Sequence, residues 1–174
     1  MTLLLKQIFA FFKLLNSDTG TNQLAAGIAC GFILGMTPAF SLQTLLVFVI
    51  IFFFRVQMGA AFLSAFFFKF AAFLFDPIFD RVGEAVLTLP SLKGLFTSLY
   101  NMPLLPYTRF NNTIVMGSGL VALLLFPFVF WGAGKAVEKY RETVVQRLRG
   151  TKVWKAFQAT GFYKWYVKYD ELFG

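Results

Sequence analysis

Polar and helix-breaking residues interrupt a long uncharged run of the chain between Asp18 and Arg55. These elbow residues are Thr37, Pro38, Ser41, Gln43 and Thr44. Proline has no backbone N–H, and serine is a favourable N-cap, so the run should fold as two short helices that meet at an elbow. The start of the second helix would present free N–H groups and a partial positive charge, which suit an anion such as a phosphate. A plain loop at the far membrane surface is the alternative.

Lys69 lies inside another apolar segment, FFFKFAAFLFD. A lysine in an apolar span is costly and is a functional candidate for that reason. Asp76 follows about two helical turns later on the same face. Lys69 could bind a lipid phosphate, form a structural ion pair, extend to the membrane surface, or join Asp76 in a path for a cation or proton.

The acidic residues Asp76, Asp80 and Glu84 are spaced four apart. Such carboxylates can bind a hard cation or exchange protons, but Pro77 should interrupt the helix, and Arg81 is close. We therefore expect them to cap helices and to be solvated. The chain has no histidine, one cysteine and no nucleotide or zinc motif. We predict no catalytic residue, no metal and no cofactor, and we do not expect an enzyme.

Composition indicates which solvent surrounds these residues. Of the 174 residues, 58% are hydrophobic and 25 are phenylalanine, and the mean hydropathy is +0.69. A soluble domain this apolar lacks the polar residues to cover its core. The net charge of +8 fits the positive-inside rule and anionic lipids better than nucleic acid. The sequence predicts an all-α integral membrane protein.

We expect three parts. Residues 1–18 should form an amphipathic helix in the membrane interface, in preference to a cleaved signal peptide, because Lys13 interrupts the apolar stretch. Residues 135–174 should form a second interfacial segment, a basic and aromatic cytoplasmic tail. Between them, residues 19–134 should form the membrane domain. Its predicted elements are a re-entrant or short-helix hairpin (22–54), a span (57–75) ended by Asp76–Pro77, an external amphipathic loop (76–110), and a span (112–134) ended by Gly132 and Gly134.

Glycines recur at helical spacing in these spans. Gly27, Gly31 and Gly35 stand four apart, and Gly117 lies in the last span. Small residues on one face allow another helix backbone to approach closely, so we assign all four to helix packing. A smooth wall beside a lipid chain is the alternative for the first three.

Charge predicts the topology. Lys6, Lys13, Arg55 and the basic tail should lie on the cytoplasmic side, with the near-neutral stretch from Asp76 to Arg109 outside. Both termini would then be cytoplasmic. The hairpin would enter the membrane and return at Arg55, with the elbow at its tip.

The elbow and its neighbours resemble a bacterial membrane family known as domain of unknown function 2062. The resemblance covers about Leu24 to Gly119, including FLSAFFFKFAAFLFDPIFDRVG and RFNNTIVMGSG. Its hallmark, Gly-x-x-x-Gly-x-x-Pro followed by Gln-Thr, corresponds to Gly31, Gly35, Pro38, Gln43 and Thr44. Two departures are Ser41, where a glycine is expected, and Phe68-Lys69-Phe70, where the wider family tends to have Asn-Pro.

Some relatives look fused to glycosyltransferases that use lipid-linked sugars, which implies a role near polyprenyl or phospholipid substrates. We therefore expect a small multi-pass protein of the bacterial inner membrane that handles lipids as a subunit of a larger lipid-transport assembly. The elbow residues and Lys69 would bind the head group. Its partners would be membrane lipids and further copies of itself or a larger envelope protein. The alternatives are a non-catalytic scaffold and, less favoured, an ion or proton path.

Overall fold

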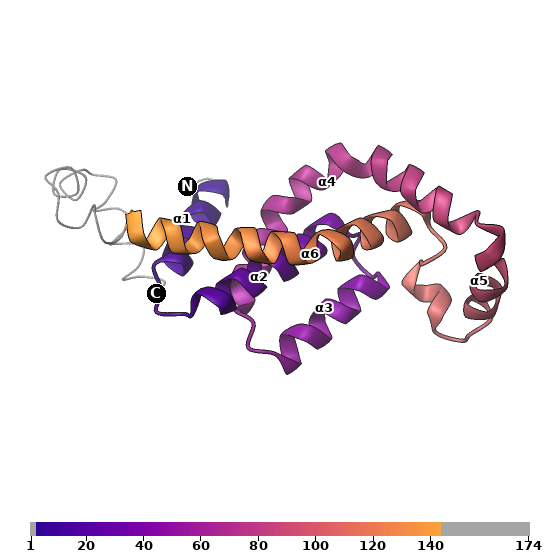
Figure 1. Cartoon of the computed structure of the whole chain (residues 1–174), viewed down its shortest axis with the longest axis horizontal. Helices are drawn as coiled ribbons and strands as arrows, with labels where there is room; N and C mark the ends of the chain where they lie inside the picture. Colours follow the sequence, from indigo (N-terminus) through magenta and orange to yellow (C-terminus); the bar gives the residue numbers. More distant parts are fainter. Residues whose placement is uncertain (1–2, 144–174) are drawn as a thin grey trace, which may run out of the picture. The chain divides into compact units, whose positions relative to one another are not determined.

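The chain is described by a computed structural model that covers residues 3–143, so most of the predicted basic tail lies outside the described residues. The described part is helical and contains no strand, as the composition predicted. It divides into two compact units, whose helices are labelled in Figure 1. The first combines the chain up to Asp18 with the chain from Lys135 onward, and the second is Thr19–Gly134.

In the first unit, α1 (Leu3–Leu15) is joined to the C-terminal end of α6. The Arg141 side chain donates from Nε to the Leu15 carbonyl oxygen at 3.1 Å, and Asn16 Nδ2 donates to the Tyr140 hydroxyl at 3.2 Å. The rings of Phe12 and Tyr140 lie 6.2 Å apart. These contacts satisfy carbonyl groups at the end of α1 that the helix itself leaves without partners.

In the second unit, the predicted hairpin is formed by α2 (Thr21–Met36) and α3 (Leu42–Phe53). Ser41 caps α3 by accepting a hydrogen bond from Thr44 N at 3.3 Å. After α3 the chain returns to where α2 began, because Gln57 N donates to the Gln23 carbonyl oxygen at 3.2 Å. Helices α2 and α3 therefore run in opposite directions, and the helix that follows α3 starts beside the start of α2.

Helix α4 (Met58–Leu87) has 30 residues and includes Pro77. The expectation that Pro77 interrupts the helix is wrong, because α4 continues to Leu87. One proline removes one backbone hydrogen bond, and packing beyond it keeps the helix intact. Phe79 is buried, and Gly83 lies against Thr113. The following connection contains η1 (Pro90–Leu92), α5 (Lys93–Tyr100) and η2 (Leu105–Thr108), so only its second half resembles the predicted loop.

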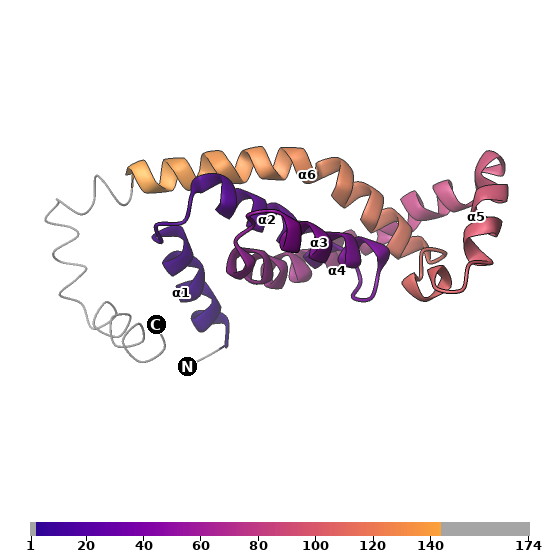
Figure 2. The same ribbon diagram turned by 90° about the horizontal axis from the view of Figure 1, so that it is seen from below.

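Helix α6 (Thr113–Tyr140) begins after the N-cap Asn112, whose side-chain oxygen accepts from Val115 N at 3.1 Å. The helix itself does not end at Gly132 and Gly134, where the predicted span ends, but continues to Tyr140. Glycine lowers helix propensity by about 1 kcal/mol relative to alanine but does not remove the backbone donor, so the helix continues. Figure 2 shows that α6 is not straight. Among the described residues, α4 and α6 are long and apolar enough to cross a membrane.

Helices α2 and α4 pack in parallel through Gly27, Gly31 and Gly35, which we call the glycine stripe. A Cβ atom built on Gly27 would lie 2.6 Å from the Gln57 carbonyl oxygen, and one on Gly31 would overlap Ser64 Oγ. One on Gly35 would meet Phe68. Each step of four residues along α2 thus matches a step of about four along α4, and the first half of α4 lies alongside α2 (Figure 2).

Helices α4 and α6 run antiparallel at their junction. Gly83 of α4 abuts Thr113, and Gly117 of α6 abuts the Phe79 carbonyl group. Added Cβ atoms would overlap the backbone at both places. This pair of glycines brings the outer part of α4 against the start of α6, which positions Lys69, Asp76 and the residues before α6 around one space.

Candidate functional site

The elbow is held by its own side chains. Thr37 is fully buried, and its hydroxyl donates to the Ile33 carbonyl oxygen at 2.8 Å. The hydroxyls of Ser41 and Thr44 are 3.1 Å apart, and Thr44 Oγ1 donates to the Pro38 carbonyl oxygen at 3.4 Å. Phe40 takes the left-handed conformation with φ of 61° and is 84% exposed. The hydroxyl groups of Thr37, Ser41 and Thr44 are thus all hydrogen-bonded within the elbow or to the end of α2.

Lys69 connects α4 to this elbow. Its Nζ atom donates to the Thr37 carbonyl oxygen at 3.1 Å. That oxygen belongs to the C-cap residue of α2, where a cation is favoured by the helix dipole. Lys69 therefore has a structural contact that fixes the position of its ammonium group.

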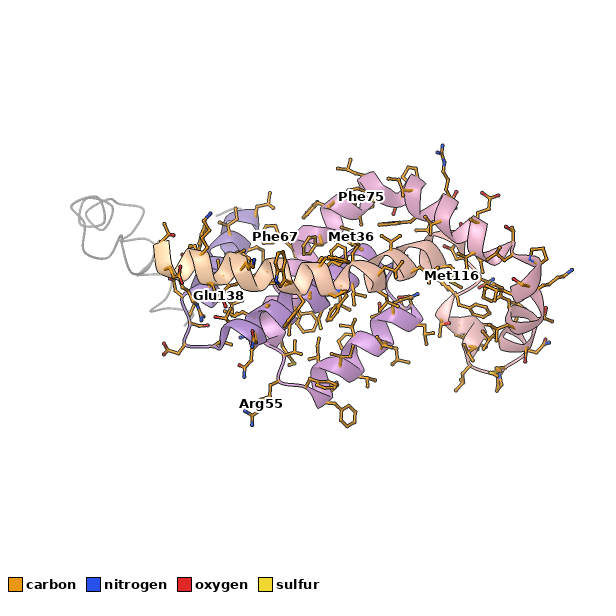
Figure 3. The ribbon with its side chains drawn as sticks, in the orientation of Figure 1. Met36, Arg55, Phe67, Phe75, Met116 and Glu138 are labelled. Carbon is orange, nitrogen blue, oxygen red and sulfur yellow. The ribbon has the colours of Figure 1, made fainter. Side chains whose placement is uncertain are left out.

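A cavity of about 280 Å³ opens where α4, the elbow and the start of α6 meet. It is lined by Met36, Pro38, Lys69, Ala72, Phe73, Asp76, Arg109, Asn112, Ile114 and Val115. Met36 is labelled in Figure 3. On α4 the lining residues from Lys69 to Asp76 follow the spacing of one helical face. The cavity combines apolar walls with three charged side chains.

The charged residues of this cavity do not neutralise one another in the described part of the chain. Lys69 is hydrogen-bonded to a carbonyl group, and no described residue forms an ion pair with Asp76 or Arg109. Asp76 is partly buried, while Lys69 and Arg109 are exposed. Solvent can therefore reach Lys69 and Arg109, and only the partly buried carboxylate of Asp76 loses part of its hydration without gaining a protein partner.

Arg109 was not among the predicted site residues. It ends η2 in the left-handed conformation with φ of 56°, and its carbonyl oxygen accepts from Asn112 N at 2.9 Å. Non-glycine residues adopt this conformation at a cost, and functional sites are enriched in it. The only sequence signal was the position of Arg109 three residues before the cap of a predicted span.

Gln43 lies outside the cavity lining. Its Nε2 atom donates to the Val115 carbonyl oxygen at 3.4 Å, and its side chain occupies the space left open by Gly119. Its Oε1 atom is buried and has no hydrogen-bond partner. Gln43 therefore joins α3 to α6 next to the cavity. Of the predicted head-group residues, Pro38 and Lys69 line the cavity, Thr37 positions Lys69, and Ser41 and Thr44 shape the turn.

The three acidic residues of α4, Asp76, Asp80 and Glu84, do not form one cluster. Asp76 lines the cavity, whereas Asp80 accepts a hydrogen bond from the Thr113 hydroxyl and so secures the start of α6. Glu84 is exposed. Within residues 3–143, no cluster of three metal-binding side chains was found.

Comparisons with known proteins extend the sequence evidence. A family model described as "Uncharacterized protein conserved in bacteria (DUF2062)" matches residues 7–145. A protein of Treponema pallidum (strain Nichols), described as an uncharacterized protein, is 31% identical over 138 residues, which cover 79% of this chain and 85% of that protein. No solved structure matches. The matched range includes every residue that lines the cavity.

Proposed function

Because the chain belongs to the bacterial family DUF2062, we propose that it is a multi-pass protein of the bacterial inner membrane that binds lipid head groups in the elbow cavity. We further propose that it does so as a subunit of a larger lipid-transport assembly. The observation that carries this proposal is the cavity itself, which Lys69 and Arg109 line together with apolar side chains.

The lengths of the helices support a membrane location for this unit. From Met58 to Asp76, α4 rises about 27 Å, close to the roughly 30 Å thickness of a hydrocarbon core. Large apolar side chains on both candidate spans are exposed, including Phe73, Leu124 and Phe128 at 68 to 71%. Exposed groups of this kind are costly in water and favourable in lipid.

In this placement the cavity lies at the head-group level of one leaflet. Arg55 lies in the connection from α3 to α4, at the opposite end of the hairpin, and extends away from the ribbon (Figure 3). If Arg55 marks the cytoplasmic side, the positive-inside rule puts the elbow and Arg109 near the outer surface. The elbow would then reach across most of the bilayer.

The chemistry of the cavity suits a phosphate ester. Two cations can share one phosphate, and a guanidinium can offer two parallel N–H groups to it. Phe73 and Ala72 supply an apolar wall on the same face of α4, where the first carbons of the lipid would lie. The binding energy would come from the charged contacts, and the orientation from this wall.

Removal of the two cations tests the proposal. The double variant Lys69→Gln, Arg109→Gln should retain no more than about one fifth of the phospholipid that the wild-type protein retains, because two charge-assisted contacts are lost. Native mass spectrometry of the purified protein would measure the bound lipid. Arg55→Gln is the matched control, because it removes one exposed cation far from the cavity.

Equal lipid retention by the folded double variant and the wild-type protein would overturn head-group binding at this cavity. The thermal unfolding midpoint must be measured alongside, because Lys69 also bonds to Thr37. A Lys69→Arg variant keeps the charge and should retain lipid. This variant separates loss of charge from loss of the native side chain.

The second candidate function is a scaffold, and α3 is the element that favours it. Of its twelve residues only Val47 and Ile51 are buried, so the helix offers a continuous apolar face. The glycine stripe is covered by α4 and so is not open to a partner. A scaffold would therefore bind its partner through α3. Loss of co-purification after leucine-to-glutamine changes on α3, with lipid retention unaltered, would favour this function.

A further inference from the structure

We propose that the elbow cavity selects a zwitterionic head group, a phosphate ester that carries a primary ammonium, over a head group that is only anionic. This inference rests on the proposed function, since it names the class of lipid that the same cavity takes. It arises from the carboxylate of Asp76, which a site for phosphate alone does not need.

Both signs of charge face the cavity. Lys69 and Arg109 supply two cations and Asp76 supplies one anion. Within the described residues these groups form no ion pair with one another. A carboxylate that only lowered the positive potential would weaken phosphate binding, and nothing described in the fold uses it as a cap or a bridge. A cationic ligand group would give it a partner.

The spacing on α4 leaves room for a ligand with two charges. Lys69 and Asp76 are seven residues apart, which is about 10 Å along the helix axis on the same face. The ammonium of Lys69 is directed to the Thr37 carbonyl oxygen, at the elbow side. A phosphate joined to an ammonium by a two-carbon link can therefore place its anion by Lys69 and Arg109 and its cation by Asp76.

The comparison with an anionic lipid isolates the role of Asp76. Phosphatidylethanolamine and phosphatidylglycerol present the same phosphodiester to the two cations. Beyond the phosphate, the first offers an ammonium and the second offers hydroxyl groups. An ammonium forms a charge-assisted hydrogen bond with a carboxylate, which is about twice as strong as a bond between neutral groups. Asp76 should therefore favour the zwitterion.

The test is a competition between the two lipids. The purified full-length protein is mixed with equal amounts of phosphatidylethanolamine and phosphatidylglycerol that have identical acyl chains, and native mass spectrometry gives the ratio bound. We expect the wild-type protein to favour phosphatidylethanolamine, and Asp76→Asn to lower the ratio at least about threefold. Asp76→Glu should keep the preference. Glu84→Gln, which removes a charge from the same helix outside the cavity, should also keep it.

The outcomes separate the two proposals. If the wild-type protein favours phosphatidylglycerol, or if Asp76→Asn keeps the wild-type ratio, selection of a zwitterion is overturned while lipid binding stands. If neither lipid is retained but soluble glycerophosphoethanolamine binds with the same dependence on Asp76, the head-group chemistry holds and the lipid source is overturned. If no phosphate ester binds in any form, both proposals fail.

Discussion

The two arms of the hairpin are both apolar helices, yet they pack in opposite ways. In α2 ten of the sixteen residues are buried, whereas in α3 only two of the twelve are. The side chains of α3 are the larger and more apolar ones, and Figure 1 shows α3 at the edge of its unit. The small residues of α2 are thus buried where α4 approaches, together with several of its larger side chains, while most of the large apolar side chains of α3 are left without a cover.

The difference begins with the glycines of α2. Gly27, Gly31 and Gly35 let the backbone of α4 approach, and Ser64 fits between the helices with its hydroxyl bonded to the Ala60 carbonyl oxygen. The α3 helix has no glycine and touches its neighbours mainly through Val47, Ile51 and the amide of Gln43.

The largest effect is expected from Gly31→Ala. An added Cβ atom would overlap the Ala61 carbonyl oxygen and Ser64 Oγ, and backbone atoms cannot move aside without separating α2 from α4. We expect a loss of at least about 2 kcal/mol in unfolding free energy, measured by denaturant titration in detergent. Gly132→Ala is the matched control, because a Cβ atom there meets nothing within 4 Å. That change should be neutral or raise stability by up to about 1 kcal/mol. Similar results for the two variants would remove the structural role of the stripe.

An intermediate effect is expected where Gln43 crosses to α6. Gly119→Ala alone should cost about 1 to 2 kcal/mol, because the new methyl group would overlap the Gln43 side chain. In a Gln43→Ala background the same change should cost much less, since the space is then empty. The double-mutant cycle measures this coupling directly, and independent effects of the two changes would show that the contact between Gln43 and Gly119 is absent.

The smallest effect is expected on the outer face of α3. Phe52 and Phe53 are 80% and 82% exposed, so their replacement by alanine should change the unfolding free energy by less than about 0.5 kcal/mol in detergent. Val47→Ala, at a fully buried position on the same helix, should cost more, about 1 kcal/mol or above. A larger loss of unfolding free energy for Phe53→Ala than for Val47→Ala would mean that another protein surface covers α3.

The sequence predicted only some of the residues of the candidate site. Lys69 and Pro38 were found because a cation and a helix breaker are conspicuous in apolar segments, and both line the cavity. Arg109 was missed, since it lies forty residues from Lys69 in a segment with other charges. Gln43 was assigned to the site because a polar residue stood out, yet its amide packs on α6.

Local sequence patterns were enough to predict several structural features of the protein. Composition gave the helical class, the Ser41 cap gave the start of α3, and the spacing of Gly27, Gly31 and Gly35 indicated a close-packing face. These features depend on neighbours within a few turns, so sequence patterns report them directly.

Only the tertiary structure decided where the long helices end and which charges meet. Pro77 is a helix breaker by local rules, but the contacts of Phe79 and Gly83 with α6 outweigh the one hydrogen bond that it removes. The cavity exists because α4 continues past that proline and carries Asp76 to the start of α6, beside Arg109. Contacts between residues so distant in sequence have no local pattern, and so the site could be completed only in three dimensions.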